Sequence, residues 1–223
     1  MLTGQTRLLL LTAGRCSIDL WLRAGRLSEP GLRSRTHASY DRMAEVAPWP
    51  DQHALRLHLA LSVLPGAAVY TALREGGWSS KDAVDAVTRA MLAVSQVPNQ
   101  AQRLLMLSDR GRRLFLRYLG PAVGAIFPAP GWRVTWVERS PQRIAFNITR
   151  CYTLDALRRL DAAPVATAYC AVDQAINASL SPRMRFSRTG TLAAGGSRCD
   201  FCFELVQPQR TPTQPGNGVR VQP

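Results

Sequence analysis

Apolar residues recur at helical spacing through the first half of the chain. Leu8, Leu11, Ile18 and Leu22 fall on one face of a helix, which predicts a helix over residues 5–24. The segments between breaks at proline and glycine predict further helices over 33–46, 52–75, 80–96 and 101–119. The first part of the chain is therefore expected to be helical.

Proline and glycine also mark where these helices bend or end. Pro65 and Gly66 interrupt the third helix, so a kink or a split into two helices is expected there. Ser79 is a favourable N-cap for the fourth helix, because its side-chain oxygen can accept a hydrogen bond from the first turn. Residues 120–131 are rich in proline and glycine, which predicts that the last helix ends at Leu119.

After residue 131 the pattern changes from helical to alternating. Residues 132–139 and 144–151 alternate on either side of a turn, which predicts a hairpin. Two helices and a second hairpin are expected to follow, over 154–160 and 164–180 and over 184–192 and 197–206. The second hairpin is centred on Gly195-Gly196, a pair typical of turns that need positive φ.

This order of elements predicts an α+β fold. An N-terminal helical part is expected to pack on a C-terminal four-stranded antiparallel sheet whose elements follow the order ββααββ. Residues 1–130 form the helical region and 131–206 an α+β region, and the two are expected to make one compact domain. The tail, 207–223, is rich in proline and glycine, which predicts disorder.

Composition and charge narrow the classes of partner. The chain has 223 residues, 46% of them hydrophobic, and a formal net charge of +13. Lys81 is the only lysine, and the arginines are scattered without a run of five. Aromatic residues make up only 7% and are not interleaved with a basic patch, so binding to nucleic acid is not expected. The charge instead favours a small anion, such as a substrate carboxylate, or an acidic partner.

The number of cysteines and the N-terminal segment indicate the cellular compartment that is expected for the protein. Five cysteines, an odd number, argue against a full disulfide framework. We therefore expect reduced thiols in a cytoplasmic protein. The apolar run from Leu8 to Leu11 is too short to span a membrane, so no membrane partner is expected. Formation of a homo-oligomer is an open alternative.

Residues 151–203 gather the groups that could carry chemistry. Four of the five cysteines lie in this stretch. Cys170 and Asp173 are three residues apart, so they share one face of the predicted helix. Cys199 and Asp200 are neighbours on a predicted strand and therefore face opposite sides, unless a bulge or a strand end brings both to one cleft.

The same stretch resembles the L-2-amino-thiazoline-4-carboxylic acid hydrolase family. The resemblance is carried by a cysteine before a helix, a C-x-x-D step and the pattern R-x-x-T-L-x-x-G-x-x-x-C-D-F-x-F. The matching residues are Cys151, Cys170, Asp173, Arg188, Thr191, Leu192, Gly195, Cys199, Asp200, Phe201 and Phe203. Residues 68–87 resemble the family's helix, glycine break and second helix. One departure is Cys202, where the family more often carries arginine.

The resemblance implies a hydrolase that opens a C–N ring of the cyclic amidine type, or acts on a related small electrophile, in secondary metabolism. A cysteine would supply the nucleophile, an aspartate would orient water or act as general acid or base, and an arginine would hold a substrate carboxylate. The candidate catalytic residues are Cys170, Asp173, Cys199 and Asp200. The candidate substrate-binding residues are Arg188, Cys151 and Thr191.

Other interpretations of these residues are open. Free cysteines are most often buried apolar fillers, and the same fold could be a non-catalytic module that binds a small ligand. No cofactor is expected, although Cys151, Cys170 and Cys199 are ligand types that suit zinc. His53 and His58 lie off one helical face, so both are interpreted as ordinary surface or packing residues.

Overall fold

Helices form the first part of the chain and an antiparallel sheet the second in the computed structural model, which describes residues 4–206, the side chain of Val97 apart. The helical elements are α1 (Gly4–Ala24), α2 (Leu32–Val46), α3 (His53–His58), a π-helical turn (Leu59–Val63), α4 (Leu64–Glu75), α5 (Ser80–Val94), α6 (Gln96–Leu105), α7 (Asp109–Ile126), α8 (Tyr152–Arg159) and α9 (Ala166–Ala178). The strands are β1 (Arg133–Arg139), β2 (Arg143–Arg150), β3 (Met184–Ser187) and β4 (Cys199–Leu205). This confirms the predicted α+β fold. The tail expected over 207–223 lies outside the described residues.

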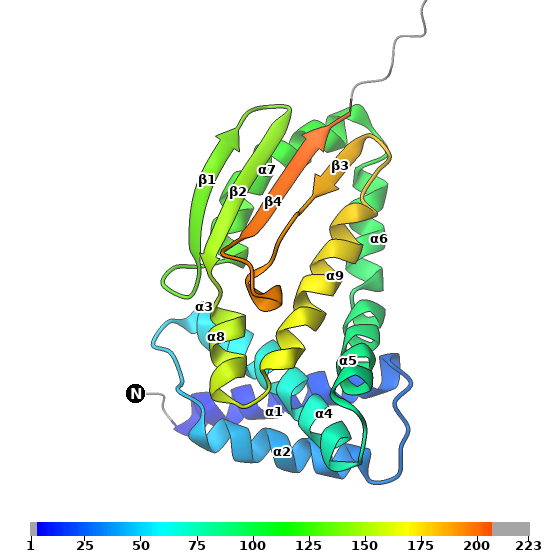
Figure 1. The fold of residues 1–223 in the computed structure, drawn as a ribbon, viewed down its shortest axis with the longest axis vertical. Helices are drawn as coiled ribbons and strands as arrows, with labels where there is room; N and C mark the ends of the chain where they lie inside the picture. Colours follow the sequence, from blue (N-terminus) through cyan, green and yellow to red (C-terminus); the bar gives the residue numbers. More distant parts are fainter. Residues whose placement is uncertain (1–3, 207–223) are drawn as a thin grey trace, which may run out of the picture.

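The sheet occupies one end of the molecule (Figure 1). The strands pair in the order β1-β2-β4-β3, all antiparallel. Helix α7 runs behind the sheet in this view, while α1 and α2 lie across the far end. Helix α9 connects the two ends, because it packs against α5 in the helical part and against β3 in the sheet.

Side-chain alternation along β4 gives the sheet one apolar face and one polar face. Cys199, Phe201 and Phe203 are buried on the inner face. The ring of Phe201 stacks on that of its β2 partner Phe146, with 5.0 Å between ring centroids. Asp200 falls on the other face, as strand alternation requires.

Two clusters of buried side chains fill the interior. One is made mainly by α1, α2, α4, α5, α8 and α9, and the other by the inner face of the sheet with α7. Cys151, Tyr152 and Leu192 pack against both clusters. Residues before and after position 130 contribute to each cluster. The two clusters therefore do not correspond to the predicted regions 1–130 and 131–206.

The helix expected over 52–75 is one continuous run from α3 to α4, and the irregularity near Pro65 takes the form of the π-helical turn. Proline has no N–H, so it cannot donate to the carbonyl one turn earlier. Side-chain hydroxyls from three other helices donate to the carbonyls of this turn: Tyr40 to Ala60 (3.1 Å), Ser17 to Leu61 (2.8 Å) and Tyr169 to Ser62 (2.7 Å). The turn is therefore anchored to α1, α2 and α9.

Hydropathy and length alone would allow the run His53–Glu75 to cross a membrane. In the part of the chain that the structure describes it is the one helix that meets this test, and 61% of its apolar window is buried inside the protein.

The chain between 96 and 131 differs from the sequence prediction. The single helix expected over 101–119 is two helices, α6 and α7, separated where Ser108 caps α7 by accepting a hydrogen bond from Gly111 N (2.9 Å). The predicted end at Leu119 is wrong, because α7 continues through Pro121 to Ile126. Pro121 leaves only the carbonyl of Arg117 without its helical donor, and Arg117 is exposed, so water can replace the lost bond.

The second hairpin is looser than the alternating pattern predicts. Strand β3 ends at Ser187, and residues 188–198 form a long connection with a 3₁₀ turn at Leu192–Ala194. Gly195 follows that turn with φ of 85°, so the predicted positive φ is confirmed at this position. The connection places residues 188–194 between the sheet and α9, where the candidate site lies.

Candidate functional site

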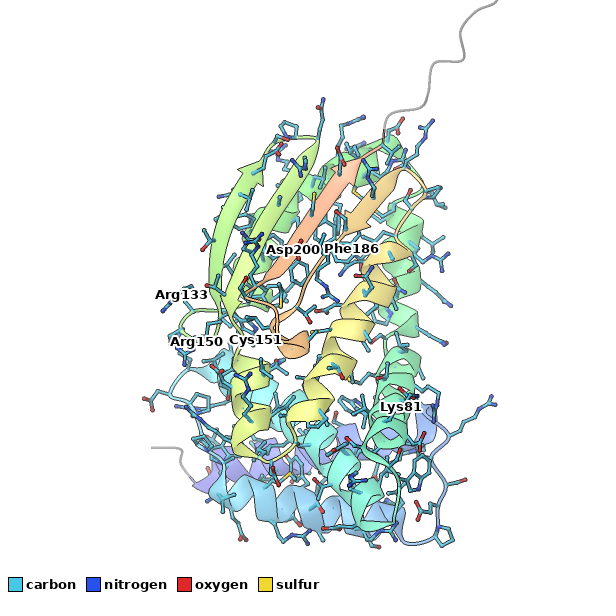
Figure 2. The ribbon with its side chains drawn as sticks, viewed as in Figure 1. Lys81, Arg133, Arg150, Cys151, Phe186 and Asp200 are labelled. Atoms are coloured by element: carbon cyan, nitrogen blue, oxygen red, sulfur yellow. The ribbon has the colours of Figure 1, made fainter. Side chains whose placement is uncertain are left out.

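A cavity of about 190 Å³ lies where the two buried clusters meet. Its walls are mostly apolar, from Trp132, Phe127, Phe201 and Leu192 among others. Its polar or titratable lining residues are His58, Cys151, Thr153, Tyr169, Cys170, Asp173, Arg188 and Cys199. We refer to it as the thiol cavity. In Figure 2, Cys151 lies where β2 passes into α8, beside this region.

The thiols of Cys170, on α9, and Cys199, on β4, interact with each other at this cavity. The sulfur of Cys199 also accepts a hydrogen bond from the backbone N–H of Leu192 (3.2 Å). The interaction with Cys170 and this hydrogen bond lower the pKa of Cys199 to about 7, with Arg188 nearby as a further stabilising charge. The interaction with Cys199 and burial raise the pKa of Cys170. The N–H of Leu192 therefore favours Cys199 as the thiolate of the pair.

Arg188, which follows β3, extends into the cavity and keeps only 6% of its side-chain surface exposed. Its Nη2 donates to the carbonyl of Cys170 (2.6 Å), and its guanidinium carbon lies 5.3 Å from the centre of the Phe201 ring. Its Nη1 is buried and has no hydrogen-bond partner within residues 4–206. A buried donor of this kind costs free energy unless a ligand satisfies it.

Asp173 lies on α9 one turn after Cys170, and Nη1 of Arg188 is 3.9 Å from its Oδ2, too far for a hydrogen bond. Its side chain is 45% exposed and lines the thiol cavity. Desolvation of the carboxyl group raises the pKa of Asp173 to about 6, against the opposing effect of Arg188. A carboxyl group with this pKa can donate or accept a proton near neutral pH.

Two further side chains complete the wall at the α3 end of the cavity. Cys151 packs against both buried clusters, and burial raises the pKa of its thiol. His58 forms a hydrogen bond of 2.9 Å with Oγ1 of Thr153, and burial lowers its pKa to about 4, so the imidazole is neutral at physiological pH. The interpretation of His58 as an ordinary packing residue missed its place on the cavity wall. No spacing in the sequence connects it to the cysteine motif.

Two of the residues predicted for the site do not line the cavity. Asp200 accepts hydrogen bonds from Thr189 N and Oγ1 and from Gly190 N, at 2.7 to 3.0 Å. Thr191 caps the 3₁₀ turn by accepting from Ala194 N (3.1 Å). Both shape the connection that carries Arg188 and Leu192, so they position the site without entering it.

The alternative of a zinc site names Cys151, Cys170 and Cys199 as ligands. Among the residues described, 4–206, no three His, Cys, Asp or Glu side chains are grouped so that they could hold a metal ion.

The assignment of the thiolate to Cys199 gives a first prediction. Alkylation by iodoacetamide, followed by peptide mass spectrometry between pH 5 and 9, should show Cys199 reacting with a midpoint near pH 7. Its reactivity should fall as the pH falls through that value, because the thiolate becomes protonated. Cys151 and Cys170 should react only at higher pH. A midpoint for Cys199 above that of exposed Cys16 would contradict the assignment.

Comparison with known proteins identifies one family. The model of the family described as L-2-amino-thiazoline-4-carboxylic acid hydrolase matches residues 56–203, about two thirds of the chain. The matched region contains all the polar lining residues of the thiol cavity, including His58. Comparison with curated proteins and with solved structures gives no match.

Proposed function

Because the chain belongs to the L-2-amino-thiazoline-4-carboxylic acid hydrolase family and is hydrolase-like at that level, we propose that it hydrolyses a small cyclic amidine that carries a carboxylate. The thiol cavity would hold the ring, and Cys199 would attack it. The proposed bond broken is the ring C–N bond of the amidine.

The observation that carries this proposal is the buried Nη1 of Arg188, which has no hydrogen-bond partner among residues 4–206, in a side chain that lines the same cavity as Cys199. A carboxylate at this position would satisfy the buried donor and offset the positive charge. The cavity of about 190 Å³ suits a small ring, and a carboxylate on that ring would fix its orientation toward Cys199.

The proposed reaction has two steps that use the groups described. The thiolate of Cys199 attacks the amidine-like carbon, a C–S bond forms, and the ring nitrogen leaves with a proton from Asp173. Water then attacks the same carbon, Asp173 accepts a proton, and the bond to Cys199 breaks to restore the thiolate. The interaction with Cys170 and the hydrogen bond from Leu192 N would stabilise the thiolate of Cys199 until substrate binds.

The pH dependence of kcat/KM tests the role of Asp173. The Cys199 thiolate is lost as pH falls through about 7, while protonated Asp173 is lost as pH rises through about 6. The profile should therefore be a narrow bell with its maximum between these values. Asp173→Asn should lower kcat by about 10²-fold, as expected for loss of a general acid, and should remove the fall on the alkaline side.

The matched control is Asp155→Asn, which removes a surface carboxylate of α8 that is paired with Arg150 at 3.2 Å. It should leave both limbs of the profile in place. If Asp173→Asn keeps the alkaline limb, the proton donor is another group.

The proposal itself is tested by incubating the purified protein with 2-amino-thiazoline-4-carboxylate and with ring analogues that lack the carboxylate. Mass spectrometry should detect a product heavier than the carboxylate substrate by one water. Binding without turnover of any ring substrate would favour the non-catalytic ligand-binding module instead.

A further inference from the structure

A second, larger cavity adjoins the thiol cavity between α7, α9 and the inner face of the sheet. Its volume is about 460 Å³, and we refer to it as the annex. Both cavities are bounded by Ile126, Phe127, Asp173 and Phe201. The two spaces are therefore neighbours around one set of side chains, and the annex extends the candidate site.

The lining of the annex is suited to an apolar group. Phenylalanine rings from the sheet and from α7 form much of its wall, and Asp173 is the only charged side chain among the described residues that line it. Asp173 stands at the boundary with the thiol cavity, so the rest of the described annex lining carries no charged side chain. Such a cavity binds alkyl or aryl groups by removing their surface from water.

The position of Arg188 connects the annex to a bound carboxylate. The guanidinium group lies over the ring of Phe201, and that ring also lines the annex. A carboxylate held at Nη1 of Arg188 would thus lie next to the entrance of the annex. Small-molecule sites typically span about 300–1,000 Å³. The thiol cavity alone, at about 190 Å³, falls below that range, whereas the two cavities together fall within it.

We propose that the annex binds an apolar substituent of the substrate whose carboxylate is held by Arg188. This inference rests on the proposed function and narrows its substrate class. The substrate is then a carboxylate-bearing cyclic amidine with an alkyl or aryl substituent, rather than the bare ring.

The test uses straight-chain carboxylates, which are not hydrolysed, as probes of the wild-type protein. Isothermal titration calorimetry should show affinity rising up to about fourfold for each methylene that enters the annex. Octanoate is four methylenes longer than butanoate and should therefore bind up to about 250-fold more tightly. The same affinity for both, within a factor of three, would overturn the proposal.

Ala122→Trp, which fills the annex from α7, should abolish this dependence on chain length. Ala125→Trp is the matched control, because Ala125 is exposed on the same helix and does not line the annex, and it should preserve the trend. If Ala122→Trp does not fold, Leu114→Glu places a charge in the annex lining and should weaken octanoate binding at least tenfold. A variant that changes the oligomeric state and leaves octanoate binding intact would identify the annex as a contact between copies, and would overturn the proposal.

These measurements test the proposal for the annex separately from the proposed hydrolysis. A chain-length trend without hydrolysis of any ring would support the annex and reject the proposed function. Hydrolysis of the bare ring with no chain-length trend among the probes would support the proposed function and reject the proposal for the annex.

Discussion

Replacing Cys199 by alanine is expected to lower kcat by on the order of 10³-fold or more, because the proposed nucleophile is removed. The sulfur accepts a hydrogen bond from Leu192 N, and this donor would be left without its acceptor. The free energy of unfolding should fall by only about 1–2 kcal/mol, since one buried sulfur is lost. Steady-state kinetics and urea denaturation measure the two effects.

Cys202→Ala is the matched control for this substitution. Cys202 lies on the same strand with its side chain on the opposite face, where its sulfur accepts a hydrogen bond from Arg143 Nε (3.3 Å). This variant should retain wild-type turnover. If Cys170→Ala abolishes turnover while Cys199→Ala does not, the nucleophile is Cys170 and the order of the thiol pair is reversed.

Replacing Arg188 by glutamine should lower kcat/KM by about 10²-fold or more, mainly through a higher KM for a carboxylate substrate. It should also raise the pH midpoint of Cys199 alkylation, because Arg188 helps to stabilise that thiolate. Arg188→Lys should rescue little, since an ammonium group cannot hold the Cys170 carbonyl and a carboxylate in one planar fork.

Arg185→Gln controls for the loss of one positive charge near the site. Arg185 is exposed on β3 and forms an ion pair with Glu204 at 2.7 Å. Its loss should leave KM unchanged. Equal effects of the two substitutions would mean that Arg188 acts only through the overall charge of the protein.

Local patterns in the sequence account for much of this arrangement. The spacing of Cys170 and Asp173 predicts one helix face, and the structure places both at the thiol cavity. Alternation along β4 sends Cys199 inward and leaves Asp200 outside the cavity, so strand geometry decides between two adjacent candidates. Such placements follow from the side-chain periodicity of a single helix or strand.

The rest depends on contacts between distant elements, which no local pattern records. Pro121 predicts a helix end, but packing of Leu119 and Val123 in the sheet cluster carries α7 through it. The choice of Cys199 over Cys170 as thiolate depends on the N–H of Leu192, whose position is set by the loop after β3. The helical spacing of His53 and His58 likewise says nothing about the cavity wall.

The π-helical turn at Leu59–Val63 changes the phase of the helix that contains it. One extra residue in a turn rotates everything before it by about 100° relative to an uninterrupted α-helix. Leu55 thereby enters the sheet cluster and His58 reaches the cavity, while residues from Leu59 onward pack among the helices. A deletion of one residue here would restore the α-helical phase and turn the imidazole of His58 away from the thiol cavity. The length of this segment is thus as much a determinant of the site as the identity of any side chain on it.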